Sequence, residues 1–242
     1  MSSNSSERDT KNVIITGASR GLGKAIAEIF AANGYNLYLT SLSQTKLYKA
    51  VEDLLNKHPG ASIKGKPFDL SKKKEAIEFG IWCLAQGKPD ILVNNAGSFA
   101  GASVHDEEDG ALEEMIETNL YSAYHLTRAI LPSMIERKSG HIFNMSSIAG
   151  LKAYPGGGSY SISKFALRGF SMNLRDELKR YNIKVTSVFP GATFTDSWAA
   201  SGLPRERFME ATDIAKMIFT SSQLSIHACV EDIILRPQLG DI

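Results

Sequence analysis

The sequence predicts one α/β domain with a seven-stranded, mostly parallel sheet that is doubly wound, with helices on both faces. Three observations support this. The chain has 242 residues, a length that one α/β domain can fill. Short apolar runs alternate along it with segments of helical periodicity. A glycine-rich turn separates the first run from the first helical segment, which is where doubly wound sheets bind ligands.

The alternation begins with an apolar run at 13–16 that stops at Gly17. Apolar residues from Leu22 to Phe30 then recur at the spacing of one helix face, and Asn33-Gly34 supplies a stop. The further strands are expected at 35–40, 63–68, 91–93, 141–145, 185–189 and 232–236, and the further helices at 47–55, 72–86, 107–119, 120–137, 159–181 and 212–222. Strands that alternate with helices in this way indicate parallel pairing and a Rossmann-type fold over residues 11–242.

Composition narrows the class of protein. Lysine and arginine number 27 against 26 acidic residues, which argues against a basic nucleic-acid binder. Two cysteines without a CxxC motif, and five histidines without paired spacing, predict no disulfide framework and no metal site. Residues 1–10 form a polar tail that we expect to be disordered. No run of about 18 apolar residues occurs, so we expect a cytoplasmic protein without a membrane segment.

The turn Thr16–Gly23 has glycines at 17, 21 and 23. Such a turn lets the backbone approach a pyrophosphate and aims helix N–H groups at its oxygens, so it predicts dinucleotide binding. The same residues also match G-x-S-x-G, the nucleophile elbow of serine hydrolases, with Ser19 as nucleophile and Asp196 and His227 following in chain order. Only one strand precedes this turn and no HGGG-type loop is present, so the hydrolase is the weaker hypothesis.

A second motif follows the strand expected at 141–145. Tyr160 and Lys164 are four residues apart and share a helix face, and Ser147 lies thirteen residues before Tyr160. Together with TGxxxGxG at 16–23, Asn94-Asn95-Ala96-Gly97, Asn119 and Pro190-Gly191, these residues make the chain resemble a classical short-chain dehydrogenase/reductase along nearly its whole length.

The resemblance implies a division of chemical work. Tyr160 is the general acid in ketone reduction, or the base in alcohol oxidation, with its pKa lowered by Lys164 and by an oxidised nicotinamide. Ser147 hydrogen-bonds the substrate oxygen, and Lys164 also holds the nicotinamide ribose. Asn119 anchors a water that connects Lys164 to solvent. The expected activity is therefore NADPH-dependent reduction of a carbonyl compound, or the reverse alcohol oxidation.

The cofactor assignment rests on the end of the second expected strand. Members that prefer NAD carry an acidic residue there, whereas this chain has Ser41. Arg20 can pair with a 2′-phosphate, although Leu42 stands where many NADP-preferring members have a second arginine. We therefore expect NADP(H), with NAD(H) as the alternative. The residues expected to bind the cofactor are Gly17, Ser19, Arg20, Gly21, Leu22, Gly23, Ser41, Ser43, Asp69, Asn95, Ala96, Gly97, Tyr160, Lys164, Pro190, Gly191 and Thr193.

The substrate pocket is expected after the fourth, fifth and sixth strands, under a small lid at 193–209, and its mostly apolar lining suits a small or medium ketone. Two alternatives stay open: a 3-oxoacyl-carrier-protein reductase that docks its carrier through Arg137 and Lys138, and a dinucleotide-binding sensor without catalysis. The family also implies a homo-oligomer, a dimer or tetramer with contacts through helices 107–137 and 159–181 and through the C-terminal segment. The expected substrate residues are Ser98, Phe99, Ala149, Leu151, Tyr154, Phe194 and Trp198.

Overall fold

The computed structural model describes residues 10–195 and 202–242. In this part of the chain seven strands form one sheet in the order β3-β2-β1-β4-β5-β6-β7, and every neighbouring pair is parallel. The predicted fold is therefore confirmed, with a fully parallel sheet. The strands are β1 (Asn12–Thr16), β2 (Asn36–Thr40), β3 (Ile63–Gly65), β4 (Ile91–Asn94), β5 (Gly140–Met145), β6 (Ile183–Pro190) and β7 (Asp232–Leu235).

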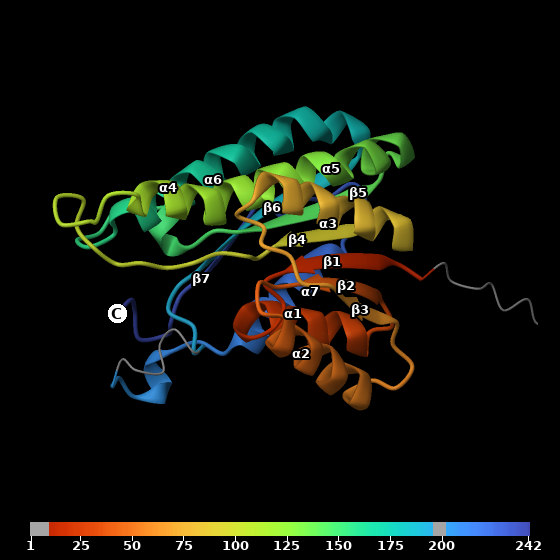
Figure 1. Ribbon diagram of the computed structural model, residues 1–242, viewed down its shortest axis with the longest axis horizontal. Helices are drawn as coiled ribbons and strands as arrows, with labels where there is room; N and C mark the ends of the chain where they lie inside the picture. Colours follow the sequence, from red (N-terminus) through yellow and green to blue (C-terminus); the bar gives the residue numbers. More distant parts are fainter. Residues whose placement is uncertain (1–9, 196–201) are drawn as a thin grey trace, which may run out of the picture.

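Helices cover both faces of the sheet (Figure 1). One face packs on α1 (Gly21–Ala32), α2 (Gln44–Lys57) and α7 (Ala211–Ser222), and the other on α3 (Lys73–Gln86), α5 (Ser122–Arg137) and α6 (Gly158–Leu178). Neighbouring side chains of β5 enter different cores, because Ile142 joins the second and Phe143 the first. A strand buried on both faces explains why the sequence shows continuous apolar runs instead of alternation.

The strand order reverses direction at β1. The chain moves outward from β1 to β2 and β3, then returns to pair β4 on the other side of β1. The loops after β1 and β4 therefore leave the carboxyl edge of the sheet in opposite directions, and a crevice opens between them. The glycine-rich turn and the segment Asn95-Ala96-Gly97 flank this crevice, as the sequence motifs predict.

Two predicted elements differ at their ends. The helix expected at 107–119 begins later, as α4 (Ala111–Ile116), because Gly110 takes a left-handed φ of 90° immediately before it. A π-helical turn (Glu117–Tyr121) then joins α4 to α5. The strand expected at 63–68 ends at Gly65, two residues before Pro67, whose ring fixes φ at about −65°.

A buried histidine links β5 to β6. The His141 side chain lies 2.7 Å (Nε2 to Oγ1) from Thr186, whose hydroxyl donates to the Val230 carbonyl. Thr186 therefore accepts from Nε2–H, and Nδ1 is left as a buried atom without a partner. Because charging this ring would bury an unpaired cation, burial lowers the pKa of His141 to about 3, and nearby Lys184 acts in the same direction.

This arrangement predicts acid-dependent stability. The ordinary histidine pKa of 6.5 is higher than the pKa of His141 in the folded protein. As the pH falls below 6.5, the unfolded chain therefore binds a proton at this histidine before the folded protein does, and the folded state loses stability. We expect the free energy of unfolding to fall by about 1.4 kcal/mol per pH unit from this group. Urea denaturation of the wild type and of His141→Gln at several pH values measures the difference. Equal slopes below pH 6.5 in both proteins would contradict the assignment.

Candidate active site

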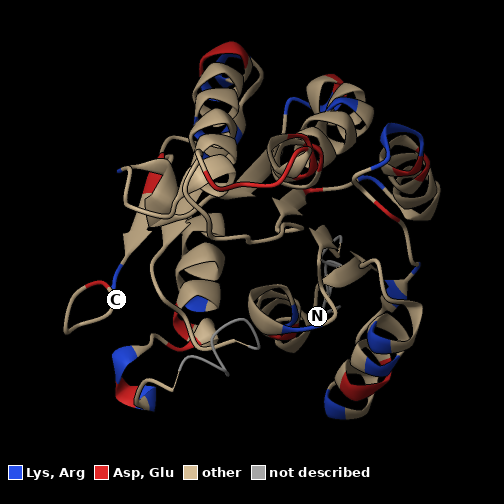
Figure 2. Ribbon diagram, turned by 60° about the vertical axis from the view of Figure 1, so that its left-hand side comes forward, with Lys and Arg blue, Asp and Glu red and all other residues tan. Residues whose placement is uncertain are grey.

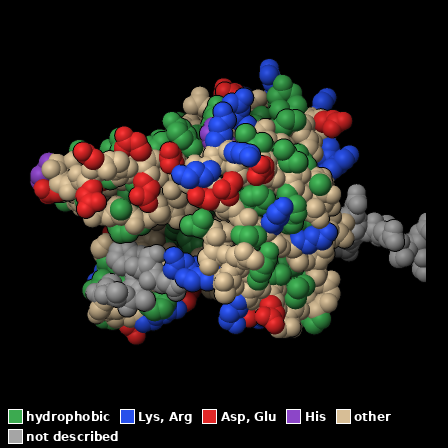
Figure 3. Space-filling view, viewed as in Figure 1, with side chains coloured by type: hydrophobic (Ala, Val, Ile, Leu, Met, Phe, Trp, Pro, Cys, Tyr) green, Lys and Arg blue, Asp and Glu red, His purple; other side chains and the backbone are tan. Residues whose placement is uncertain are grey.

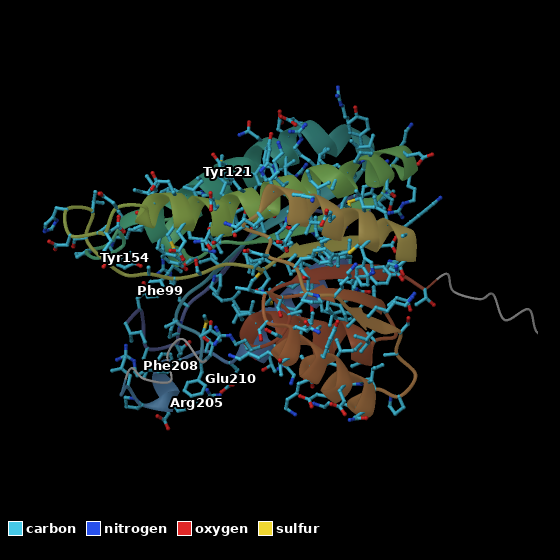
Figure 4. The ribbon with its side chains drawn as sticks, viewed as in Figure 1. Phe99, Tyr121, Tyr154, Arg205, Phe208 and Glu210 are labelled. Atoms are coloured by element: carbon cyan, nitrogen blue, oxygen red, sulfur yellow. The ribbon has the colours of Figure 1, made fainter. Side chains whose placement is uncertain are left out.

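A cavity of about 500 Å³ opens at the carboxyl edge of the sheet, on the side where the loops after β4, β5 and β6 meet. Figure 4 shows Phe99 and Tyr154 on its upper side and Arg205, Phe208 and Glu210 below. Its lining combines the predicted catalytic groups with the nicotinamide end of the predicted cofactor site. The predicted residues that line it are Leu22, Asn95, Gly97, Ser98, Phe99, Ser147, Ala149, Tyr154, Tyr160, Lys164, Pro190, Gly191 and Thr193.

Three of the predicted catalytic side chains meet inside this cavity. Tyr160 and Lys164 lie on the first two turns of α6, and the Lys164 ammonium is 5.6 Å from the centre of the Tyr160 ring. Ser147 follows β5 and begins a short 3₁₀ turn (Ile148–Gly150), where its hydroxyl accepts from the N–H of Ala149 at 3.2 Å. Ser147 thus has both a capping bond and a place beside Tyr160.

Lys164 is buried, with 6% of its surface exposed. Its ammonium donates to the backbone carbonyl of Met145, the last residue of β5, at 3.0 Å. Burial lowers the pKa of Lys164 to about 8, because the charged form loses its hydration. The lysine therefore remains mostly protonated at neutral pH and loses its proton at slightly alkaline pH.

Tyr160 does not show the lowered pKa that the sequence analysis expects. Burial raises the pKa of its phenol, a hydrogen bond with Ser147 lowers it, and Tyr154 raises it again. The Lys164 ammonium lies 5.6 Å from the centre of the ring, but burial dominates the pKa of the phenol. In the protein alone the Tyr160 hydroxyl is therefore held in its protonated form, which is the form that a general acid requires.

Asn119 lies in the π-helical turn between α4 and α5 and is fully buried. Its amide oxygen accepts from the N–H of Ser98 at 2.9 Å, and its nitrogen donates to the Ser98 carbonyl at 3.1 Å and to the Ser163 hydroxyl at 2.9 Å. The backbone of Gly97 passes between Asn119 and Lys164, and a methyl group there would lie 2.8 Å from the Asn119 oxygen. Asn119 therefore fixes the loop after β4 against α6.

The glycine-rich turn fits an anionic ligand. Gly17 and Gly21 have left-handed φ values of 63° and 52°, and α1 begins at Gly21 with no side chain capping its N–H groups. Those N–H groups are free to meet a pyrophosphate. Asn95 holds the turn in place, because its amide donates to the carbonyls of Thr16 and Gly17 at 2.9 and 3.2 Å.

The loop after β4 is tied to β1 as well. The Thr16 hydroxyl accepts from the N–H groups of Asn95 and Ala96 at 2.9 and 2.7 Å. Asn94 points the other way, into the sheet, where it donates to the side chains of Thr127 and Asn144 at 3.0 and 2.8 Å. The four-residue motif at 94–97 is therefore divided between a structural network and the crevice.

The expected adenosine end lies beside the carboxyl ends of β2 and β3, outside the cavity. The Ser41 hydroxyl donates to the Ser43 carbonyl at 3.2 Å, and Ser43 caps α2 by accepting from Lys46. One oxygen of Asp69 accepts from the Ser71 N–H and hydroxyl, which leaves the other for a ligand. Arg20 is exposed at the start of α1. No carboxylate occurs between residues 40 and 43.

The expected substrate residues divide into three groups. Ser98, Phe99, Ala149 and Tyr154 line the cavity, whereas Leu151 and Phe194 do not. Phe194 instead packs on the Phe208 ring and under the Arg205 guanidinium, so it belongs to the base of the expected lid. Trp198 lies outside the described residues. The ends of the lid segment are held together where Thr193 pairs with Met209.

The serine hydrolase hypothesis is wrong for geometric reasons. Ser19 follows β1 at the carboxyl edge of the sheet. His227 lies just after residues 224 and 225, whose carbonyls bind Lys184 at the amino end of β6. Since the sheet is parallel, Ser19 and His227 lie at opposite edges and cannot share a proton. Asp196 lies outside the described residues.

Sequence reasoning missed the part of the cavity wall that follows β7. Arg236 and Asp241 form an ion pair there, and Ile242 lies beside them. The rule that ligand sites follow the carboxyl ends of strands applies to β7 as it does to β4, β5 and β6, and could have predicted this wall. Lys152, after β5, was also missed and lines the cavity. Among the described residues no group of three His, Cys, Asp or Glu side chains could hold a metal ion.

A glycine-lined helix start and a buried Tyr–Lys pair at one edge of a parallel sheet define a dinucleotide-dependent oxidoreductase. The model of the short chain dehydrogenase family matches residues 11–205, and the chain belongs to this family. An uncharacterized oxidoreductase of Staphylococcus aureus is 30% identical over 94% of this chain and 97% of its own length.

Solved structures agree with this assignment. An alcohol dehydrogenase from the archaeon Thermococcus sibiricus, complexed with 5-hydroxy-NADP, is 28% identical with a TM-score of 0.87, over 95% of this chain and 97% of that one. L-sorbose reductase from Gluconobacter frateurii, complexed with NADPH and L-sorbose, is 25% identical with a TM-score of 0.86, over 94% and 95% of the two chains.

The close packing of the glycine turn predicts the effect of one methyl group. A Cβ at Gly23 would collide with the Gly17 carbonyl and lie 2.6 Å from the Asn95 amide. We expect Gly23→Ala to reduce the free energy of unfolding by about 2 kcal/mol and to weaken dinucleotide binding. Gly169→Ala is the matched control on α6, where a Cβ meets open space, and it should stay within about 1 kcal/mol of wild type. Urea denaturation decides, and equal stability of the two variants would refute the packing argument.

Proposed function

We propose that this protein reduces a carbonyl compound to an alcohol with NADPH, or catalyses the reverse oxidation, with Tyr160 as the general acid or base. The observation that carries the proposal is the convergence of Ser147, Tyr160 and Lys164 in one cavity that continues to the glycine-rich turn. When bound, NADPH supplies the hydride. The chain supplies the proton, the orientation of the substrate and a cavity with a partly apolar lining.

In this mechanism the substrate oxygen lies between the hydroxyls of Ser147 and Tyr160. Ser147 donates a hydrogen bond to it, and Tyr160 transfers its proton as negative charge develops on that oxygen. The tyrosinate left behind is stabilised by the buried ammonium of Lys164, which Met145 holds in place. In the oxidation direction Tyr160 first has to lose its own proton before it accepts that of the alcohol, and burial opposes that loss because it raises the pKa of the phenol.

NADP(H) is the cofactor that the residues support best. A 2′-phosphate at the end of β2 would be held by the guanidinium of Arg20 and the Ser43 hydroxyl, and by the Ser41 hydroxyl once that releases the Ser43 carbonyl, and no carboxylate would repel it there. The T. sibiricus and G. frateurii enzymes are complexed with 5-hydroxy-NADP and with NADPH, which agrees with this choice.

The structure disfavours the carrier-protein substrate. Arg137, the expected docking residue, pairs with Asp90 at 3.0 Å just before β4, at the amino edge of the sheet and away from the cavity. The segment beside the cavity is acidic instead: residues 106–117 contain seven carboxylates and no lysine or arginine. They gather in red on the projecting end in Figure 3 and on the loop and helix brought forward in Figure 2. This segment offers a carrier no basic residue. The basic residues that line the cavity are Lys152, Lys164 and Arg236, of which Lys164 is buried and Arg236 pairs with Asp241.

We also propose that the chain forms a homo-oligomer through the outer faces of α4 to α6. Exposed apolar side chains gather there, with Ile162, Phe165 and Met172 on α6 and Leu112 on α4. Figure 4 shows Tyr121 on the same outer layer. We further propose that residues 193–209 form a small lid of the substrate pocket.

In the described part of the chain no helix is long and apolar enough to cross a membrane.

Removing the phenol hydroxyl tests the proposed acid. Tyr160→Phe should lower kcat for carbonyl reduction by about a thousandfold, because it removes the proton donor and keeps the ring. The Kd for NADPH should stay within about twofold of wild type. Steady-state NADPH consumption and calorimetric titration measure the two quantities. Tyr48→Phe, on the exposed face of α2, is the control with unchanged turnover. Near-normal kcat in Tyr160→Phe would rule out this tyrosine as the acid.

A further inference from the structure

One carboxylate of the acidic segment at 106–117 differs from the other six. Glu107 is partly buried, whereas the remaining acidic side chains of the segment are exposed. It lies on the loop between β4 and α4, which also carries Phe99 of the cavity wall. Burying a carboxylate costs free energy unless hydrogen-bond donors of the protein replace the water around it. The position of Glu107 therefore requires such donors.

The replacement donors belong to the first turn of α6. The Glu107 carboxylate accepts from the Ser159 N–H at 2.7 Å and from the Ser159 hydroxyl at 2.5 Å. Both hydrogen bonds lower the pKa of Glu107, so it stays ionised at neutral pH. The N-cap residue of α6 is Gly157, which has no side chain to satisfy the helix N–H groups. A residue 52 positions earlier in the chain therefore does the work of a cap.

Glycines on both loops make this contact close. Gly158 has a left-handed φ of 38°, and a Cβ there would collide with the Glu107 carboxylate and the Ala102 carbonyl. A Cβ at Gly101 would lie 3.1 Å from the Phe99 ring and 3.7 Å from the Gly156 carbonyl. The two loops thus pack backbone against backbone. Glycines at 156, 157 and 158 also give the backbone at the start of α6 more conformational freedom than other residues would.

The clamped turn carries the proposed acid. Tyr160 follows Ser159 directly, and the Phe99 ring meets the Tyr160 ring edge-on, with centroids 4.8 Å apart. Any loosening between Glu107 and Ser159 therefore moves Phe99 away from Tyr160 and frees the turn that aims the Tyr160 hydroxyl. Figure 1 shows the loop before α4 beside the start of α6.

We propose that Glu107 is a positioning residue for the carbonyl reduction: its carboxylate clamps the loop after β4 to the first turn of α6 and so holds Tyr160 and Phe99 in their working arrangement. The inference rests on the proposed role of Tyr160. The clamp does not touch the glycine-rich turn, and Thr16 and Asn119 hold residues 95–98 without it, so we expect most of the cofactor affinity to remain when the clamp is lost.

The test compares Glu107→Ala, Glu107→Gln and Ser159→Ala with Glu108→Ala, the exposed neighbouring carboxylate, as the matched control. We expect Glu107→Ala to lower kcat/KM for a carbonyl substrate by about tenfold or more, with the Kd for NADPH within about twofold of wild type. Glu107→Gln should stay within about threefold of wild type, because its amide can accept from the Ser159 N–H and donate to the Ser159 hydroxyl. Glu108→Ala should match wild type.

A double variant shows whether the two residues act through one contact. Glu107→Ala/Ser159→Ala should be no worse than Glu107→Ala alone, within about threefold, because the hydroxyl has no partner left to lose. Hydrogen exchange measures the clamp without turnover. Peptides covering 98–110 and 158–161 should exchange faster in Glu107→Ala and at the wild-type rate in Glu107→Gln and Glu108→Ala.

Three results would overturn the proposal: wild-type kcat/KM in Glu107→Ala, an equal loss in Glu107→Gln and Glu107→Ala, or wild-type exchange in Glu107→Ala. A failure of the proposed function looks different. The wild type would then consume no NADPH with any carbonyl. Hydrogen exchange alone would decide whether the clamp exists, and its proposed role in carbonyl reduction would be overturned.

Discussion

The site depends on one buried positive charge. The Lys164 ammonium is enclosed between α6 and the end of β5, where the Met145 carbonyl is its hydrogen-bond partner. A buried ammonium is costly unless hydrogen bonds replace its lost hydration, and neighbouring polar contacts hold its helix against the strand that supplies the carbonyl. Ser146 donates to the Lys164 carbonyl, Asn119 binds Ser163, and Asn144 binds Ser171 further along α6. The helix that carries Tyr160 is thereby held against β5 over several turns, which gives the phenol a defined place relative to Ser147.

Most of the fold follows from local sequence. The strand at 13–16 is a short, mostly apolar run buried on both faces, and helices such as 159–181 have one apolar face, so the apolar pattern alone locates them. Element ends depend on single residues. Gly110 delays α4, and Pro67 ends β3, because each changes the backbone beyond what the apolar pattern records. The parallel topology then places Ser147, Tyr160 and Gly97 at one edge without further information.

The rest of the site is set by contacts between residues far apart in the chain, which no local pattern encodes. Glu107 reads as the first residue of an acidic helix, yet it lies in a loop and caps α6. Arg137 reads as an exposed basic residue, but the topology sends it to the opposite edge of the sheet. The pKa of Tyr160 was expected to fall from the charge of Lys164, whereas burial dominates and raises it. In each case the deciding quantity is the three-dimensional environment of the side chain.

Reduction of carbonyl compounds with NADPH is the activity that we propose for this cavity. The most direct measurement is cofactor consumption by the purified protein across a panel of ketones, aldehydes and keto sugars, with NADPH and NADH in parallel and the product identified by mass spectrometry. We expect at least one carbonyl to be converted to its alcohol, with one alcohol formed for each NADPH oxidised, and the reaction to be slower with NADH. Tight binding of NADPH without oxidation by any member of the panel would contradict it and would favour a dinucleotide-binding protein that does not catalyse.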